Sequence, residues 1–442
     1  MKGTGLRAWS RDETLPGRAG DAALAPLGAA AVLDLVNGSM LREGAPAVAE
    51  AHWTYARWKP GISLCTAYEL VFEDASRETL VAKRHAGDKA KTLAERDESR
   101  ASAADGDWPT HLRPPLVLPD EHLYLWASHD DRELPALRAL SDVRRSRNLL
   151  RKLDLFPGLS IRKRRSSTTL LRYRPERRAV VRMDLAFRDD DGSKSKARMA
   201  ARALPPSRSL RVQQQRLACG ALPIGPRLIG RDDRTGLLLE EWLEVDVPEP
   251  DDFDHALRAG TVLAALHIHE APGGELRPED DLSSLAPLFA WSPELVAKTQ
   301  GLVSRMPGDA PVPCWTHGDF HPDQVVTESA SEAGTGGGGV RLLDLDELSP
   351  GDPHLDLASW IADHLLSADG IDWDQAAGPL LAGYAEGGGP VVDETRLRTR
   401  VALALVQRAA ASCRRLEQDA ERVASTLLDR ARELAPAGSL FR

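Results

Sequence analysis

Residues 315–326 read WTHGDFHPDQVV, and residues 340–346, after a glycine-rich stretch, read VRLLDLD. The first segment places a carboxylate, Asp319, on a tight loop and an amide side chain, Gln324, five residues later. The second is a short apolar run that ends in Asp344. We expect the apolar residues on either side of the glycines to pair as a hairpin, which would bring the amide next to this carboxylate. A carboxylate that orients the attacking hydroxyl, together with oxygen ligands for Mg²⁺, is the set that phosphoryl transfer requires.

This order of residues resembles the motif of the aminoglycoside phosphotransferase and choline kinase-like family, which also includes sugar kinases. That motif is His-Gly-Asp, four residues, Asn, a strand that ends in Asp, and a later Asp-Leu-Ala, which stands here at residues 356–358. The match is specific over residues 315–360 and extends over residues 165–440. The resemblance implies an α+β fold, the two-lobed protein-kinase-like fold, with an antiparallel sheet in the N-lobe and a mostly helical C-lobe.

By this resemblance, Asp319 is the catalytic base, His317 braces its loop, and Asp356 stabilises the loop from the start of a helix. Asp344 is then the main Mg²⁺ ligand, and Asp346 is either a second ligand or a solvated carboxylate. A His-Gly-Asp segment alone is more often an ordinary turn. The amide, the hairpin and the second carboxylate, all in the expected order, favour an active site instead.

Two positions depart from the family pattern. Gln324 takes the metal-ligand position usually held by Asn, and its side chain is one methylene longer, which shifts the ligand geometry. The family also places a Lys on the third strand of the N-lobe, where it contacts the nucleotide phosphates and pairs with a Glu of the following helix. An ungapped reading gives Arg198 at that position, with Lys194 and Lys196 on the same strand face as further nucleotide-binding cations. The following helix offers glutamines at residues 213–215 but no Glu.

The sequence also contains an internal repeat. Residues 57–72 align with residues 172–187 at an offset of 115, with an Arg-aromatic pair, a turn proline, and a Leu and a Phe at matching places. Each copy predicts the order strand–strand–strand–helix–strand–strand, which is that of a kinase N-lobe. We therefore expect an additional N-lobe-like domain before the nucleotide lobe. Extended without a gap, the repeat places Lys83 opposite Arg198. We expect Lys83 to be structural, with a contribution to the nucleotide site as the alternative.

These patterns divide the chain into four predicted parts: a lead-in segment at 1–50, an N-lobe-like repeat at 51–154, a nucleotide N-lobe at 160–244 and a catalytic, acceptor-binding helical C-lobe at 245–442. Apolar residues at helical spacing predict further helices at 91–103, 131–153, 210–221, 253–269 and 401–434.

The nucleotide lobe contains two candidate segments for ATP. Residues 162–182 carry nine Arg or Lys and one acidic residue, and Arg174, Arg177 and Arg178 surround the turn that would cover the phosphates. Because this turn lacks a glycine-rich loop, arginine side chains would replace backbone amides there, unless the segment is only a solvated basic face. By the resemblance, the adenine would meet the hinge at Glu241 and Trp242.

Composition excludes several classes of partner. The net charge of −9 argues against a protein that coats nucleic acid. No stretch approaches eighteen consecutive apolar residues, and the first forty residues lack the pattern of a secretory signal, so we expect no membrane partner. The four cysteines are widely spaced and form no metal-ligand pattern, which indicates free thiols in a reducing cytoplasm.

The sequence thus predicts an ATP- and Mg²⁺-dependent kinase. It would transfer the γ-phosphoryl group to a hydroxyl of a small molecule, such as an aminoglycoside, a sugar or an amino alcohol. One alternative is a peptide Ser/Thr kinase of the same fold, because the extra lobe offers a surface for a larger substrate. The other is a pseudokinase, a binding or scaffold protein, which Gln324 and Arg198 favour and the intact Asp319 and Asp344 oppose.

Overall fold

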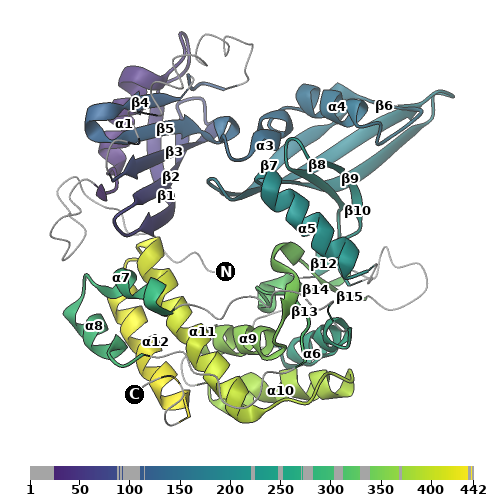
Figure 1. Cartoon of the computed structure of the whole chain (residues 1–442). Helices are drawn as coiled ribbons and strands as arrows, with labels where there is room; N and C mark the ends of the chain where they lie inside the picture. The colour runs from purple at the N-terminus through teal and green to yellow at the C-terminus, as the bar shows by residue number, and fades with distance from the viewer. Residues whose placement is uncertain are drawn as a thin grey trace.

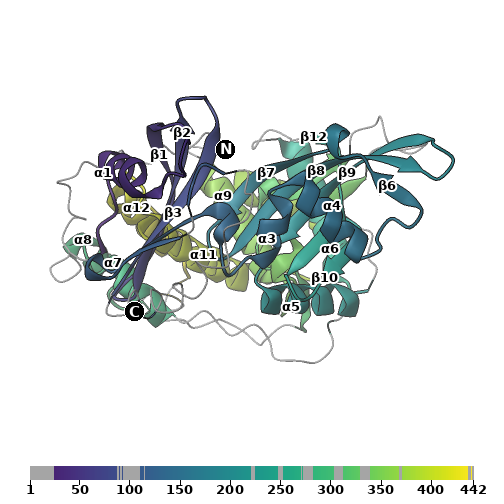
Figure 2. The ribbon, with the colours of Figure 1, turned by 90° about the horizontal axis from the view of Figure 1, so that it is seen from above.

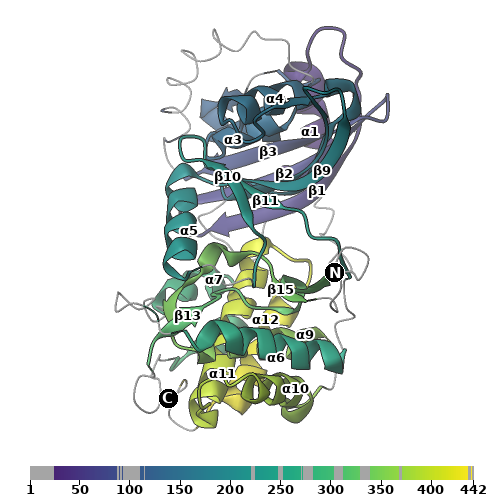
Figure 3. The same ribbon diagram turned by 90° about the vertical axis from the view of Figure 1, so that its right-hand side faces the viewer.

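The computed structural model describes residues 24–86, 89, 92, 110–113, 115–220, 224–246, 252–269, 271, 282–302, 312–328, 339–367, 371–436 and 440. Along the chain come a first antiparallel sheet, a second antiparallel sheet and a mostly helical region (Figure 1). Seen from above, the two sheets lie next to each other over the helices (Figure 2). A side view shows the sheets on one side of the molecule and the helical region on the other (Figure 3).

The first sheet has the strand order β1-β2-β3-β5-β4. Its strands are β1 (Val48–Lys59), β2 (Ser63–Phe72), β3 (Arg77–His85), β4 (Leu116–Leu118) and β5 (Leu123–Ala127). Strand β2 is buried on both faces, because its side chains alternate between two clusters. One cluster includes Tyr68 and Leu70 and packs under α1 (Ala29–Leu35), which lies within the predicted lead-in segment. The helix predicted at 91–103 lies almost entirely outside the described residues.

The second sheet has the strand order β10-β11-β9-β8-β6, and β7 also pairs with β8. Its strands are β6 (Leu159–Ile161), β7 (Ser167–Arg174), β8 (Arg178–Asp189), β9 (Lys194–Ala203), β10 (Leu228–Asp232) and β11 (Leu237–Glu241). The helices α3 (Pro135–Leu140) and α4 (Val143–Lys152) bury their apolar faces against this sheet, although their segment was assigned to the first domain. The other face packs against α5 (Pro206–Ala218).

The two sheets share one strand order, since β7-β8-β9-β11-β10 repeats β1-β2-β3-β5-β4. Their registers also match: Lys83 lies opposite Cys65, and Arg202 lies opposite Val180, which is 115 residues after Cys65. Lys83 therefore corresponds to Arg202, and the predicted match with Arg198 is wrong. The reason is that β8 and β9 each extend two residues further at their hairpin end than β2 and β3 do. That the first sheet is an additional N-lobe stays a prediction.

The helical region is built from α6 (Phe253–His267), α7 (Ala286–Phe289), α8 (Pro293–Thr299), α9 (His354–Ser367), α10 (Trp373–Glu386), α11 (Glu394–Arg415) and α12 (Ala420–Leu434). Helices α6 and α10 approach so closely that a Cβ at Gly383 would lie 1.9 Å from the carbonyl oxygen of Leu257. The first sheet also touches this region, since Trp58 of β1 shares a core with Cys413 of α11. None of the helices in the described part combines the length and hydropathy that a bilayer crossing requires.

Candidate active site

The loop that carries Asp319 follows strand β13 (Cys314–Thr316) and is fixed from beneath by a buried carboxylate. Asp356, near the start of α9, accepts hydrogen bonds from the backbone N–H groups of His317 at 2.6 Å and Gly318 at 2.8 Å. Burial opposes the charge of Asp356, but His267, whose Nε2 lies 3.0 Å away, outweighs that effect together with His317 and holds its pKa below the usual range. With Gly318 at a φ of +82°, the chain turns sharply and leaves the side chain of Asp319 exposed.

The same loop is tied to the end of a predicted hairpin. Strands β14 (Val325–Glu328) and β15 (Val340–Leu342) pair as expected from the sequence. The ring Nε2 of His317 lies 2.8 Å from the carbonyl oxygen of Leu343, directly before Asp344. The amide nitrogen of Gln324 lies 3.5 Å from Asp344 Oδ2 and 3.0 Å from His321 Nε2. The structure therefore brings the amide and the second carboxylate together beside the loop of the first.

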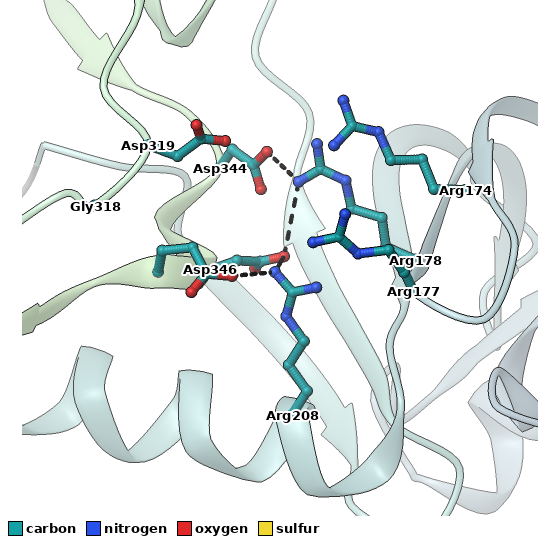
Figure 4. A pocket seen from close by; sticks show the side chains of 9 residues that line it. Arg174, Arg177, Arg178, Arg208, Gly318, Asp319, Asp344 and Asp346 are labelled. Carbon is teal, nitrogen blue, oxygen red and sulfur yellow. Dashed lines mark hydrogen bonds and ion pairs between the residues drawn. The ribbon is translucent and has the colours of Figure 1, made fainter. Parts of the chain in front are cut away.

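Two arginines of the second sheet, Arg178 and Arg202, neutralise the carboxylates at this hairpin. Figure 4 shows Arg178 beside Asp344. Arg202 Nη2 lies 2.8 Å from Asp344 Oδ1 and 2.6 Å from Asp346 Oδ2. Arg178 donates from Nη1 to the other oxygen of Asp344. Burial alone would raise the pKa of Asp344, but Arg202 and Arg178 hold it well below its usual range. The two arginines therefore favour the ionised form of Asp344.

These groups border a cavity of about 350 Å³ between the second sheet and the helical region. Its lining is almost entirely charged: Arg174, Arg177, Arg178, Arg208, Gly318, Asp319, Asp344, Asp346 and Glu347. Within the described residues, neither Arg174 nor Arg177 forms an ion pair with a carboxylate. Burial and the neighbouring arginines Arg178 and Arg172 lower the pKa of Arg174 to about 10. A cavity that leaves half-buried cations without counterions is suited to an anionic ligand such as a phosphate chain.

A divalent cation would find oxygen ligands here. Asp344, Asp346 and the Gln324 amide are adjacent, and Asp346 Oδ1 is buried without a hydrogen-bond partner. In the described residues no group of three or more His, Cys, Asp or Glu side chains has metal-binding geometry. The donor set fits Mg²⁺, which uses one or two carboxylates and takes its remaining ligands from phosphates and water. Such an ion would share these carboxylates with Arg178 and Arg202.

Residues 160–403, more than half of the chain, match the model of the phosphotransferase enzyme family. The chain belongs to this family. A search of curated protein sequences found no significant match. Among solved structures, a choline kinase from Cryptosporidium parvum is similar with a TM-score of 0.46 and 11% identity, over 66% of this chain and 95% of that chain. A macrolide 2'-phosphotransferase from Brachybacterium faecium is similar with a TM-score of 0.41 and 18% identity, over 65% of this chain and 98% of that chain.

Membership of the phosphotransferase family confirms three predictions: the suspected family, the kinase-like α+β fold with its antiparallel sheet and helical region, and an enzyme that uses an alcohol group as acceptor. The roles of individual residues stay predictions. The structure brings some of the predicted residues together at the cavity and places others away from it. Asp319, Asp344 and Asp346 line the cavity and Gln324 lies beside Asp344. His317 and Asp356 hold the loop and hairpin behind them.

Of the predicted nucleotide-binding cations of this phosphotransferase, Arg178 lines the cavity, but two others lie elsewhere. Lys196 and Arg198 are exposed, and Arg198 pairs with Asp184 at 2.7 Å and with Glu244, away from the cavity. Arg202, four residues further along the same strand face, is the side chain that reaches the carboxylates. The sequence signal that identifies it is the repeat, once the longer hairpin of the second copy is taken into account.

The expected acidic partner of the strand cation also comes from a different element. Glu240 of β11 lies 3.7 Å from Arg202 and is almost fully buried, so a strand rather than a helix supplies this carboxylate. At the predicted hinge, Glu241 accepts a hydrogen bond from the backbone N–H of Arg227 at 2.7 Å. The indole nitrogen of Trp242 is buried without a hydrogen-bond partner.

Proposed function

We propose that this enzyme transfers the γ-phosphoryl group of ATP, in the presence of Mg²⁺, to a hydroxyl group of a small molecule. One observation carries the proposal: a single cavity holds an exposed carboxylate, a set of oxygen ligands for a divalent cation, and arginines without counterions. Phosphoryl transfer depends mainly on positioning and on charge stabilisation, and these are the groups that supply both.

In this proposal, the acceptor hydroxyl lies against Asp319, which orients it and takes its proton. The acceptor oxygen forms a bond to the γ-phosphorus as the bond from phosphorus to the bridging β–γ oxygen breaks, so that ADP leaves. Arg174 and Arg177 bind phosphate oxygens and stabilise the charge that spreads over them. Asp344, with Gln324, would hold Mg²⁺, which supplies further positive charge next to the phosphates.

The acceptor would be an alcohol such as an aminoglycoside, a sugar or an amino alcohol. No comparison supports a peptide or protein substrate. A specific observation does favour the pseudokinase alternative, because Arg178 and Arg202 already neutralise Asp344 and Asp346, the carboxylates that the metal needs. The two functions differ in turnover, so measuring turnover separates them.

The test is a coupled assay of ADP release with Mg²⁺ and a panel of sugars, amino sugars and amino alcohols. Wild type should turn over with at least one acceptor class, and Asp319→Asn should lower kcat by about 10²- to 10⁴-fold, which is the usual contribution of a general base. Asp323→Asn, an exposed carboxylate four residues further on, is the matched control and should keep wild-type turnover. If wild type and Asp319→Asn are equally inert while ATP still raises Tm, the chain is a nucleotide-binding protein and the enzymatic proposal fails.

A further inference from the structure

The turn between β7 and β8, residues 175–177, supplies Arg177 to the cavity, and the strand ends on either side of it supply Arg174 and Arg178. At its centre, Glu176 has a φ of +61°, the left-handed region that residues other than glycine rarely adopt. A residue other than glycine keeps this strained backbone conformation only when its surroundings hold it there. The position of the cavity arginines therefore depends on whatever holds Glu176 in place.

That support comes from outside the second sheet. Lys83 of β3, in the first sheet, donates to both carboxylate oxygens of Glu176, at 2.6 and 2.7 Å. Its side chain is only 12% exposed, so water competes little for the ion pair. Asp131, in the connection between the two sheets, accepts the backbone N–H of Glu176 at 2.8 Å and the hydroxyl of Tyr173 at 2.7 Å. Glu176 is thus held twice: Lys83 binds its carboxylate, and Asp131 binds its backbone N–H.

The first sheet also provides an apolar surface for the same hairpin. Tyr173, at the end of β7, packs against a buried cluster of the first sheet that includes Cys65, Tyr124 and Trp126. In Figure 1 the hairpin of β7 and β8 reaches from the second sheet toward the first. Lys83 emerges at the side of this cluster, because it pairs in register with Cys65 on one side and with Tyr124 on the other. The first sheet therefore supports the turn between β7 and β8 both by apolar packing and by an ion pair.

The matching registers of the two sheets identify the residue of the second sheet that corresponds to Lys83. Lys83 occupies the place in the first sheet that Arg202 occupies in the second. In the second sheet the cation at this place reaches Asp344 and Asp346 at the cavity. In the first sheet the corresponding cation reaches across to Glu176 instead. The same strand position thus serves the cavity directly in one sheet and indirectly in the other.

We propose that the first sheet supports the turn that covers the donor phosphates, with Lys83 and Asp131 as positioning residues that hold Arg174 and Arg177 over the cavity. This inference rests on the proposed function, since it assigns the turn to the phosphates of the donor nucleotide. Lys83 itself touches neither nucleotide nor acceptor. Its loss should therefore weaken binding of the nucleotide while leaving the acceptor unaffected.

The test is a charge reversal. Lys83→Glu and Glu176→Lys should each raise KM for ATP about tenfold, because a small displacement of positioning groups has a large effect on a site of this kind. KM for the acceptor should change less than twofold, and the double variant Lys83→Glu/Glu176→Lys should return KM for ATP to near the wild-type value. Arg77→Glu is the matched control, because Arg77 forms an exposed ion pair with Glu69 on the same sheet, far from the turn. This control should leave both constants unchanged.

A structural role alone would give a different pattern. If the single variants lower Tm but keep KM for ATP within twofold of wild type, the positioning role is refuted; so is it if the double variant fails to restore KM. Should either reversal prevent folding, Lys83→Met and Glu176→Gln remove the ion pair without creating a like-charge contact. The expected rise in KM for ATP is then the same for both, and the double variant should be no worse than either single variant.

Hydrogen exchange separates this inference from the proposed function. The amide of Glu176 is bonded to Asp131, so in wild type its exchange should be slow. Each reversal should accelerate exchange in a peptide covering residues 174–178, and the double variant should slow it again, whether or not the chain turns over ATP. If turnover is absent and the exchange pattern is as expected, only the proposed function fails. If exchange in this peptide is the same in all variants, the inference fails whatever the turnover.

Discussion

Replacement of Arg202 by Met would remove the charge that holds the cavity carboxylates together while keeping most of the side-chain volume. Arg202 is 6% exposed and lies within 4 Å of three carboxylates: Asp344, Asp346 and Glu240. Removal of one partner from a buried ion pair costs about 3–5 kcal/mol. Here Arg178 still contacts Asp344, so we expect the lower end, about 3 kcal/mol.

For a folding unit of about 150–250 residues, each kcal/mol shifts Tm by about 2–4 °C, so that loss corresponds to a fall in Tm of roughly 6–12 °C. Differential scanning calorimetry in EDTA measures it, and Arg198→Met on the same strand is the matched control. Arg198 is exposed and its ion pairs are solvated, so its loss should leave Tm close to the wild-type value. The Arg202→Met variant should also recover part of its Tm in millimolar Mg²⁺, because its carboxylates lack a cation. An equal effect of the two substitutions, or no response of Arg202→Met to Mg²⁺, would refute this view of the site.

Two further predictions concern buried carboxylates away from the cavity. Burial raises the pKa of Asp131 from 3.8 to about 6, so the folded protein binds a proton that the unfolded chain releases. The free energy of unfolding should therefore fall by about 2 kcal/mol as the pH rises from about 4 to about 6, and urea titrations across this range should lose that slope in Asp131→Asn. Asp356→Asn should cost about 2–4 kcal/mol and lower kcat in parallel, because an amide cannot accept from both backbone N–H groups of the catalytic loop; urea titration and the ADP assay together measure this. Unchanged kcat in a destabilised Asp356→Asn would show that the loop does not depend on this carboxylate.

The loop that carries Asp319 and the neighbouring hairpin could be predicted from the sequence because their geometry follows from short spacings. Gln324 follows Asp319 after four intervening residues, and paired strands then determine where Asp344 lies. The long-range partner Asp356 came from the resemblance to a family motif rather than from spacing. Its hydrogen bonds to the loop span 38 and 39 residues, a distance over which pattern alone carries no information.

The register of β9 could not be predicted because its outer half has no apolar pattern. Residues 194–198 are exposed, so no buried face indicates where the hairpin turns, and the ungapped repeat led to Arg198. The segment of α3 and α4 shows a second limit. Apolar spacing at Leu137, Leu140 and Leu150 predicts a helix with a buried face but not which of two sheets it covers. The contact of Lys83 with Glu176 spans 93 residues and two sheets, and no local signal indicates it.

The pairing of Asp344 with two arginines accounts for how one site could serve both a metal and a phosphate chain. Arg178 and Arg202 are both buried, so a move away from Asp344 is favourable only if other anions take its place beside them; Asp346 already lies within 4 Å of each. Donor phosphates are such anions, and they would arrive in the same cavity. Once the arginines turn to phosphate oxygens, Asp344 is free to hold a cation in their place. In the proposed function, binding of metal and binding of nucleotide therefore favour each other, since each compensates the charge that the other would leave unpaired.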